Sequence, residues 1–262
     1  MDNRRVTRQD LLRLARARVI TTEELGGLFS VSSSRAARIA FDLKRRGLLT
    51  KVKRGVYASV PLDTDPDRFR PDPFVAVQKA LGEGYAFSHF SALSLLGGER
   101  TVRRNLQVVA PGVRPRNRRV GEVTVHIRRI PKGVWDSDTS DVRRGGVSLR
   151  VTRPERTLID LAALPAAQQD YEEELAGYRY LLPRSDPAAL AKEVRGVHQL
   201  KTLARVGHLI KASGHARGEL ATLVSELRAR VANTSPSYFG TAPRSTGNRF
   251  DSEFKLVYPG AT

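Results

Sequence analysis

The sequence predicts an α+β protein, in which an N-terminal segment of helices and a hairpin precedes a mixed α/β region and a C-terminal helical region. Three observations predict this class. Residues 7–46 repeat their apolar positions with helical spacing, whereas residues 48–60 and 105–152 contain the short alternating runs of half-buried strands. Residues 168–232 return to helical periodicity. With 262 residues and 40% apolar content, the chain can bury a substantial core and form more than one domain.

Three helices are predicted at the N-terminus, each with a recognisable start. The first covers Thr7–Ala17. The second opens at Thr21, which stands three residues before Glu24, the spacing at which a hydroxyl and a carboxylate cap free backbone N–H groups reciprocally. Ser32 caps the third helix, which ends before Gly47, because glycine readily adopts the left-handed conformation that follows many helices.

A hairpin is predicted directly after the third helix. The runs Leu48–Val52 and Val56–Val60 alternate apolar and polar residues around the three-residue loop Lys53-Arg54-Gly55. A winged helix-turn-helix typically consists, in this order, of a helix, a short helix, a turn, a longer helix and a basic hairpin. We therefore predict a winged helix-turn-helix followed by a mixed α/β region and a C-terminal helical region.

Basic and hydroxyl side chains mark this segment as a candidate DNA-binding domain. The first turn of the third helix would face base edges in the major groove, and arginine matches the acceptors of guanine. The hairpin would contact phosphates or the minor groove. The predicted DNA-binding residues are Ser33, Ser34, Arg35, Arg38, Lys51, Lys53 and Arg54. The alternative is a protein-interaction module whose basic residues form an ordinary solvated face.

The charge distribution favours a polyanionic partner. The net charge is +18, and residues 1–60 hold 14 Lys and Arg against 5 Asp and Glu. We find no signal peptide, amphipathic anchor or apolar run of spanning length, so we expect a cytoplasmic protein with no membrane partner. The chain has no cysteine, which excludes disulfides, thiol catalysis and cysteine zinc sites.

A polar, proline-rich stretch divides the chain. We predict a DNA-binding domain at residues 1–62, a linker at 63–72, and an α/β and helical domain at 73–262. In the last of these, two short helices at Pro73–Leu81 and Ser88–Leu96 are expected first, followed by three strands, a helix that begins at Thr152–Glu155, four further helices and one further strand. The strands are Asn105–Ala110, Glu122–Ile130, Gly146–Thr152 and Phe254–Tyr258, and the helices are Gln168–Leu182, Pro187–Val194, Gln199–Lys211 and Glu219–Val231.

Three motifs outside the N-terminal segment carry a family resemblance. They are Tyr85-Ala86-Phe87-Ser88-His89-Phe90-Ser91-Ala92-Leu93, Val151-Thr152-Arg153-Pro154-Glu155-Arg156-Thr157-Leu158-Ile159-Asp160 and Leu203-Ala204-Arg205-Val206-Gly207-His208-Leu209-Ile210. Together with the winged helix, they occur in the order found in the AbiEi family, which the chain resembles. This family comprises the antitoxin and transcriptional-regulator half of bacterial type IV toxin–antitoxin modules for phage defence by abortive infection. Two positions depart from the family pattern, since Val206 replaces a leucine and His208 an aromatic residue.

The resemblance implies two functions and two partners. The N-terminal domain is expected to repress its own operon by binding double-stranded operator DNA. The C-terminal domain is expected to counteract a nucleotidyltransferase-like toxin, in a bacterial, nucleoid-associated setting. The alternative is a stand-alone winged-helix regulator whose C-terminal domain dimerises or senses a ligand.

Two further basic features are candidate contact surfaces. Arg114, Arg116, Arg118 and Arg119 lie in what we interpret as a strand-connecting loop, where they form a candidate auxiliary contact to DNA or RNA. Lys201, Arg205 and His208 share one face of a C-terminal helix and form a candidate antitoxin surface. The alternative for both is an ordinary solvated surface.

No catalytic, metal or cofactor site is predicted. Adjacent residues on a helix point about 100° apart, so His89 should not serve Ser88 as a base, and Ser88 is interpreted as a helix cap. Glu155 is expected to form a capping box with Thr152, and Arg156 to pair with Asp160. A nucleic-acid-processing enzyme is disfavoured, because the histidines lack ligand spacing and no acidic constellation is visible.

Overall fold

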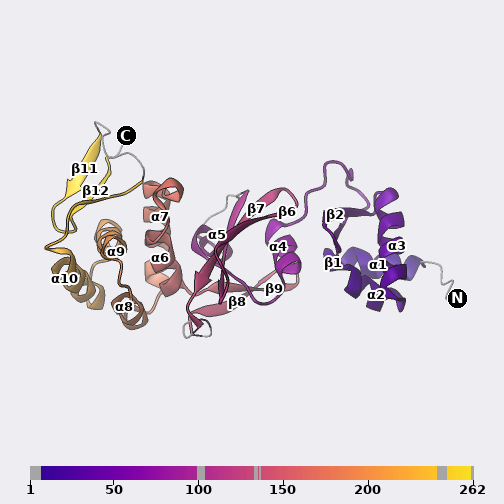
Figure 1. Ribbon diagram of the computed structural model, residues 1–262, viewed down its shortest axis with the longest axis horizontal. Coiled ribbons are helices and arrows are strands. Elements are labelled where there is room, and N and C mark those ends of the chain that lie inside the picture. The colour runs from indigo at the N-terminus through magenta and orange to yellow at the C-terminus, as the bar shows by residue number, and fades with distance from the viewer. Residues whose placement is uncertain (1–6, 99–103, 133–134, 136, 241–246, 261–262) are drawn as a thin grey trace. The chain divides into compact units, whose positions relative to one another are not determined.

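The structure, a computed structural model, describes residues 7–98, 104–132, 135, 137–240 and 247–260. Helices and three β-sheets are interspersed along these residues, which confirms the predicted α+β class (Figure 1). None of the described helices is long and apolar enough to cross a membrane.

The N-terminal helices form where their capping residues predict them. Thr7 and Asp10 make a capping box at the start of the first helix, and Thr21 and Glu24 make another at the start of the second. Gly47 follows the third helix with a φ of 71°. The elements are α1 (Arg8–Arg16), β1 (Val19–Thr21), α2 (Thr22–Phe29), α3 (Ser33–Arg45), β2 (Leu49–Lys53) and β3 (Val56–Ser59).

A small antiparallel sheet, in the order β1-β3-β2, completes this segment. The three-residue strand β1 was not predicted. The predicted loop is also one residue too long. Strand β2 continues through Lys53, with a register shift between Lys51 and Lys53, so only Arg54 and Gly55 remain in the turn. Gly55 has a φ of 78°, which suits a tight hairpin turn. The helices and the sheet enclose a core that contains Leu14, Ile20, Leu25, Phe29, Ile39, Leu43 and Leu49.

A six-stranded sheet follows, in the order β6-β7-β5-β4-β9-β8, so that β6 and β8 are its edge strands. Its predicted strands are found within one or two residues of their expected ends, whereas β4, β6 and β8 were not predicted. The elements of this region are α4 (Pro73–Leu81), β4 (Ala86–Phe87), α5 (His89–Leu95), β5 (Asn105–Pro111), β6 (Arg116–Val120), β7 (Val123–Ile130), β8 (Thr139–Arg144) and β9 (Val147–Thr152).

The chain forms two compact units, whose limits differ from the predicted domain boundaries. The first contains residues 1–86, 103–129 and 141–150, and the second contains the remaining segments. Residues 63–72 therefore lie inside the first unit. The reason is that α4 contacts all three strands of the small sheet. Lys79 of α4 forms an ion pair with Glu24 of α2, and Arg144 of β8 binds Asp72 at 2.6 Å.

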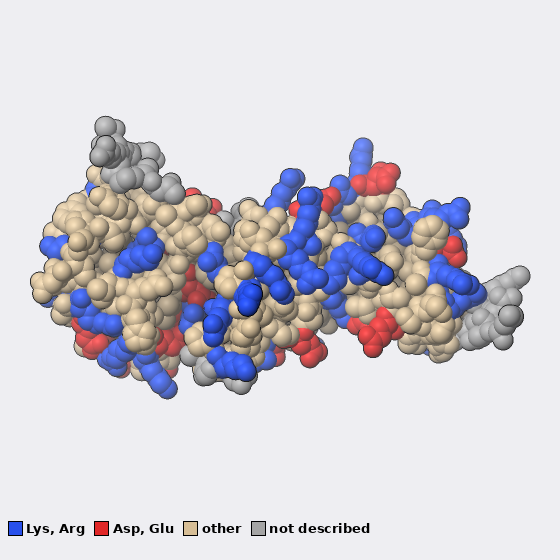
Figure 2. Space-filling view, viewed as in Figure 1, with Lys and Arg blue, Asp and Glu red and all other residues tan. Residues whose placement is uncertain are grey.

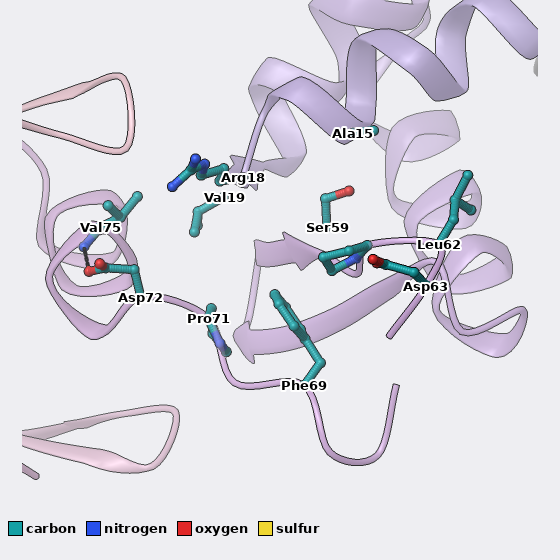
Figure 3. Close-up of a pocket in the computed structure, with 11 residues that line it drawn as sticks. Ala15, Arg18, Val19, Ser59, Leu62, Asp63, Phe69, Pro71, Asp72 and Val75 are labelled. Carbon is teal, nitrogen blue, oxygen red and sulfur yellow. Dashed lines mark hydrogen bonds between the residues drawn. The ribbon is translucent and has the colours of Figure 1, made fainter. Parts of the chain in front are cut away.

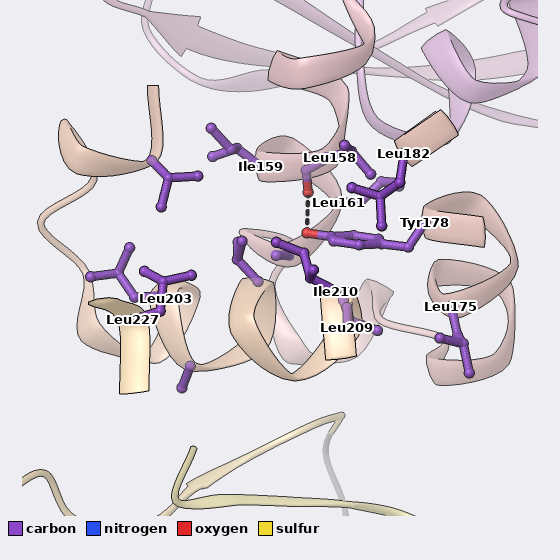
Figure 4. Close-up of a cluster of buried hydrophobic side chains, with 14 of the residues drawn as sticks. Leu158, Ile159, Leu161, Leu175, Tyr178, Leu182, Leu203, Leu209, Ile210 and Leu227 are labelled. Carbon is purple, nitrogen blue, oxygen red and sulfur yellow. Dashed lines mark hydrogen bonds between the residues drawn. The ribbon is translucent and has the colours of Figure 1, made fainter. Parts of the chain in front are cut away.

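The second unit is built around a helical core. The predicted helices are found as α7 (Tyr171–Leu181), α8 (Pro187–Arg195), α9 (Leu200–Ala212) and α10 (Glu219–Val231), preceded by α6 (Pro154–Ala162). The phenol of Tyr178 is fully buried and donates to the Leu158 carbonyl at 2.7 Å (Figure 4). Three short strands follow: β10 (Ser237–Tyr238), β11 (Asn248–Asp251) and β12 (Leu256–Pro259).

Candidate nucleic-acid interface

The first two turns of α3 present hydroxyl and basic side chains to solvent. Ser33, Ser34 and Arg38 are exposed. Arg35 is half-buried, and its Nε atom has no hydrogen-bond partner among the described residues. The Ser32 hydroxyl caps the helix by accepting from the Arg35 backbone N–H at 3.4 Å. Because the opposite face of α3 is buried, the exposed groups are held in one direction at the N-terminal end of the helix.

The hairpin presents two of its three predicted basic residues to solvent. Lys51 and Arg54 are exposed. Lys53 is half-buried, and its ammonium group donates to the Ala80 carbonyl at the end of α4. Partial burial and the nearby Arg118 guanidinium both lower the pKa of Lys53. Lys53 therefore helps to hold α4 against the hairpin, a role that the sequence did not indicate because Ala80 lies 27 residues away.

The arginine-rich segment is an edge strand, so its interpretation as a connecting loop is wrong. Arg116, Arg118 and Arg119 lie in β6, which pairs antiparallel with β7, and Arg114 precedes the strand. All four arginines are exposed. An edge strand pairs on one side only and needs few apolar residues, which is why periodicity failed to identify it.

Two of the three residues of the candidate antitoxin surface on α9 are buried, so the prediction that they face solvent is wrong. Arg205 and His208 are only 6% and 4% exposed. The Arg205 guanidinium donates to the carbonyl of Tyr238 at 2.8 Å and to those of Ala162 and Leu164 at 3.3 and 3.4 Å. It therefore joins α6 and β10 to α9 instead of facing solvent.

His208 is enclosed by the C-terminal strands. Its Nδ1 atom lies 2.7 Å from Asp251 Oδ2, and its Nε2 atom lies 3.1 Å from the Tyr171 hydroxyl. The Tyr258 ring packs 4.4 Å away, measured between ring centroids. Burial alone would raise the pKa of Asp251, but the hydrogen bond and charge of His208 hold it below its usual value. Of the three predicted residues, Lys201 is exposed.

Ser88 and His89 are hydrogen-bonded to each other, contrary to our prediction. The Ser88 Oγ and His89 Nδ1 atoms are 2.8 Å apart. The prediction assumed a right-handed helical backbone, whereas His89 has a φ of 53°, which changes the direction of its ring. Ser88 occupies the cap position of α5, but its side chain makes no capping bond. Both residues are buried, at 0% and 4% exposure, so the pair is packed inside the fold and not open to a substrate in solution.

The polar side chains of the motif at residues 151–160 also make contacts inside the fold. The predicted capping box is wrong, because Arg153 is the cap residue of α6. The Thr152 hydroxyl instead lies 2.8 Å from that of Thr157, and the Glu155 carboxylate accepts from the Asp186 backbone N–H at 2.7 Å. These contacts tie α6 to β9 and to the start of α8, so they support packing.

The predicted ion pair in α6 is confirmed. Arg156 Nε binds Asp160 Oδ1 at 2.8 Å, and both side chains are largely buried. The Asp160 carboxylate raises the pKa of Arg156.

Burial, together with neighbouring carboxylates, raises the pKa of Glu193 to about 7. Among the described residues, no group of three His, Asp or Glu side chains could hold a metal ion.

A crevice of about 550 Å³ lies within the first unit, beside the predicted linker (Figure 3). Phe69 and Pro71 form part of its wall, together with Val19 and Val75. Asp72 also lines it, but its carboxylate is already engaged, since it caps α4 and binds Arg144. The crevice shows that residues 61–71 lie along the folded unit and do not form an extended tether.

Comparison with known proteins supports the fold. No family model and no curated protein matches the chain. One similar solved structure is the crystal structure of the RV2827C protein from Mycobacterium tuberculosis. It superposes with a TM-score of 0.69 and 21% sequence identity, over 95% of this chain and 89% of that one. The two proteins therefore share an overall fold.

Proposed function

We propose that the protein is a transcriptional repressor that binds duplex DNA through a winged helix-turn-helix formed by α1–α3 and the β2–β3 hairpin. The observation that carries this proposal is the exposed N-terminal half of α3, where Ser33, Ser34 and Arg38 project from a helix whose other face is buried. A helix held in this way can enter the major groove with its N-terminal residues against the base edges.

The hairpin supports the same function. Lys51 and Arg54 are exposed on it, at a site suited to phosphate contacts that position the protein on the duplex. Electrostatic attraction would add to these contacts, because the net charge of the chain is +18. A protein-interaction module would not need this combination of a polar first turn and a basic hairpin.

The resemblance to the AbiEi family supports a second part of the proposal. We propose that the operator lies upstream of the protein's own gene, and that the second unit counteracts a nucleotidyltransferase-like toxin. Arg205 and His208 are buried, so this activity would depend on other groups, among which Lys201 is exposed. The alternative, a stand-alone regulator that senses a ligand or dimerises, is distinguished by whether co-expression relieves the toxicity of a nucleotidyltransferase encoded next to the gene.

The DNA-binding function is tested by titrating the purified protein against the duplex upstream of its gene and a shuffled duplex of equal length. We expect the upstream duplex to bind about 10³-fold or more tightly. We also expect the affinity for both duplexes to fall steeply between 50 and 200 mM salt, because on the order of five phosphate contacts would each release counterions on binding. Equal affinity for the two duplexes, or affinity independent of salt, would contradict the proposal.

A further inference from the structure

Basic side chains gather on the first unit outside the proposed winged helix. Arg114, Arg116, Arg118 and Arg119 are exposed on and beside β6, at one edge of the six-stranded sheet. Figure 2, in the same view as Figure 1, shows Lys and Arg gathered over the region of β6 and β7 and continuing over that of β2. This group of four side chains, which we call the β6 arginines, needs an explanation.

The β6 arginines are not neutralised by any acidic side chain that the structure describes. Among the residues that the structure describes, none forms an ion pair with them. Glu122, the acidic residue next to the strand in the sequence, is bound by Arg70 at 2.7 Å. Arg119 donates through Nε to the Gly121 carbonyl at 3.2 Å, a contact that brings no compensating charge.

The β6 arginines are continuous with the basic hairpin. The backbone N–H of Gly121, in the turn between β6 and β7, donates to the Val52 carbonyl at 3.0 Å. Val52 lies on β2, an edge strand of the small sheet, between Lys51 and Lys53. Arg118 lies close enough to Lys53 for its charge to lower the pKa of that ammonium group. Two edge strands from different sheets therefore place their basic residues side by side.

Like charges held together in this way repel one another unless an anion binds. Charged residues also prevent an edge strand from pairing with another chain, but a mixture of positive and negative residues prevents it equally well. Protection of the edge alone would not place Arg118 beside Lys53. The arrangement instead suits a polyanion long enough to contact both strands.

We infer that the β6 arginines form a second backbone-binding surface, which extends the contact of the hairpin along the same DNA duplex. The inference rests on the proposed function, because it takes the hairpin to lie on DNA. Arg116 and Arg118 are two positions apart on one strand, so they lie on the same face of β6 and can contact successive phosphates. Contacts of this kind add affinity without reading sequence.

The test uses the full-length double variant Arg116→Ala/Arg118→Ala, with Arg143→Ala as the matched control. Arg143 is an exposed arginine on β8, the opposite edge of the same sheet. We expect the double variant to bind the upstream and shuffled duplexes about tenfold more weakly, and its log–log salt slope to fall by about 2, since each lost phosphate contact accounts for about 0.9. The control should bind both duplexes as the wild type does.

The outcomes separate this inference from the proposed function. The double variant could bind both duplexes with the affinity and the salt slope of the wild type, while Arg38→Ala still lost its preference for the upstream duplex. This result would overturn the β6 contact and leave the repressor proposal intact. Weakened binding to an RNA hairpin, with duplex DNA unaffected, would also overturn it. If the wild type did not distinguish the two duplexes at all, the proposed function itself would fail.

Discussion

Replacing Gly207 by alanine is expected to destabilise the second unit by about 3 kcal/mol or more, because no room exists for a methyl group there. An added Cβ would overlap the ring of Phe254, lying 2.8 Å from its Cδ1 and Cζ atoms. Phe254 is fully buried against α9 and cannot move without opening the core. Urea unfolding followed by circular dichroism measures the loss.

Gly27→Ala is the matched control, since Gly27 is an exposed glycine in helix α2 with open space around it. Alanine should stabilise that helix by about 0.5–1 kcal/mol, because glycine has the poorer helix propensity. A Gly207→Ala protein as stable as the wild type would show that Phe254 does not pack on α9 in solution.

Glu174→Gln is expected to stabilise the protein above neutral pH. Glu174 is fully buried, and its two carboxylate oxygens have no hydrogen-bond partner among the described residues. Burial raises its pKa to about 9, despite the opposing effect of Arg205. The folded state therefore retains a proton that the unfolded chain releases above its ordinary pKa of 4.5. Stability should fall as pH rises from there toward 9, and glutamine should remove this loss.

The expected gain for Glu174→Gln is on the order of 5 kcal/mol at pH 8, because each pH unit between 4.5 and 8 contributes about 1.4 kcal/mol. The gain should vanish well below pH 4.5, where both states are protonated. Unfolding titrations at several pH values measure it. Glu172→Gln serves as the control, because Glu172 is exposed on the same helix. If the pH dependence of Glu174→Gln matched that of the wild type, Glu174 would be ionised in the folded protein and its burial would be less complete than the structure indicates.

Features that depend on neighbouring residues could be predicted from the sequence. Thr21 and Glu24 are three residues apart, and the hydrogen bonds that they form are local, so the start of α2 follows from the two residue types. The buried face of α3 follows from helical periodicity in the same way. Ala36, Ile39, Ala40 and Leu43 recur in the sequence at helical spacing, and all four are buried.

Features that depend on distant residues could not be predicted. Periodicity correctly placed Arg205 and His208 on one face of α9, but it carries no information about what covers that face. The cover comes from Tyr238 and Asp251, which lie 33 and 43 residues further along the chain. Likewise, the half-burial of Lys53 depends on α4, and the identity of β6 as a strand depends on pairing with β7.

One comparison tests the proposed DNA reading by α3 most directly: the ratio of affinities for the upstream and shuffled duplexes, measured for the wild type, Arg38→Ala and Arg45→Ala. Arg45 is the matched control, because it is exposed in the last turn of the same helix, away from the proposed base contacts. We expect Arg38→Ala to reduce the ratio by about tenfold or more, corresponding to about 1–3 kcal/mol, and Arg45→Ala to preserve it. A folded Arg38→Ala protein that distinguishes the two duplexes as well as the wild type does would contradict the assignment of α3 as the reading helix.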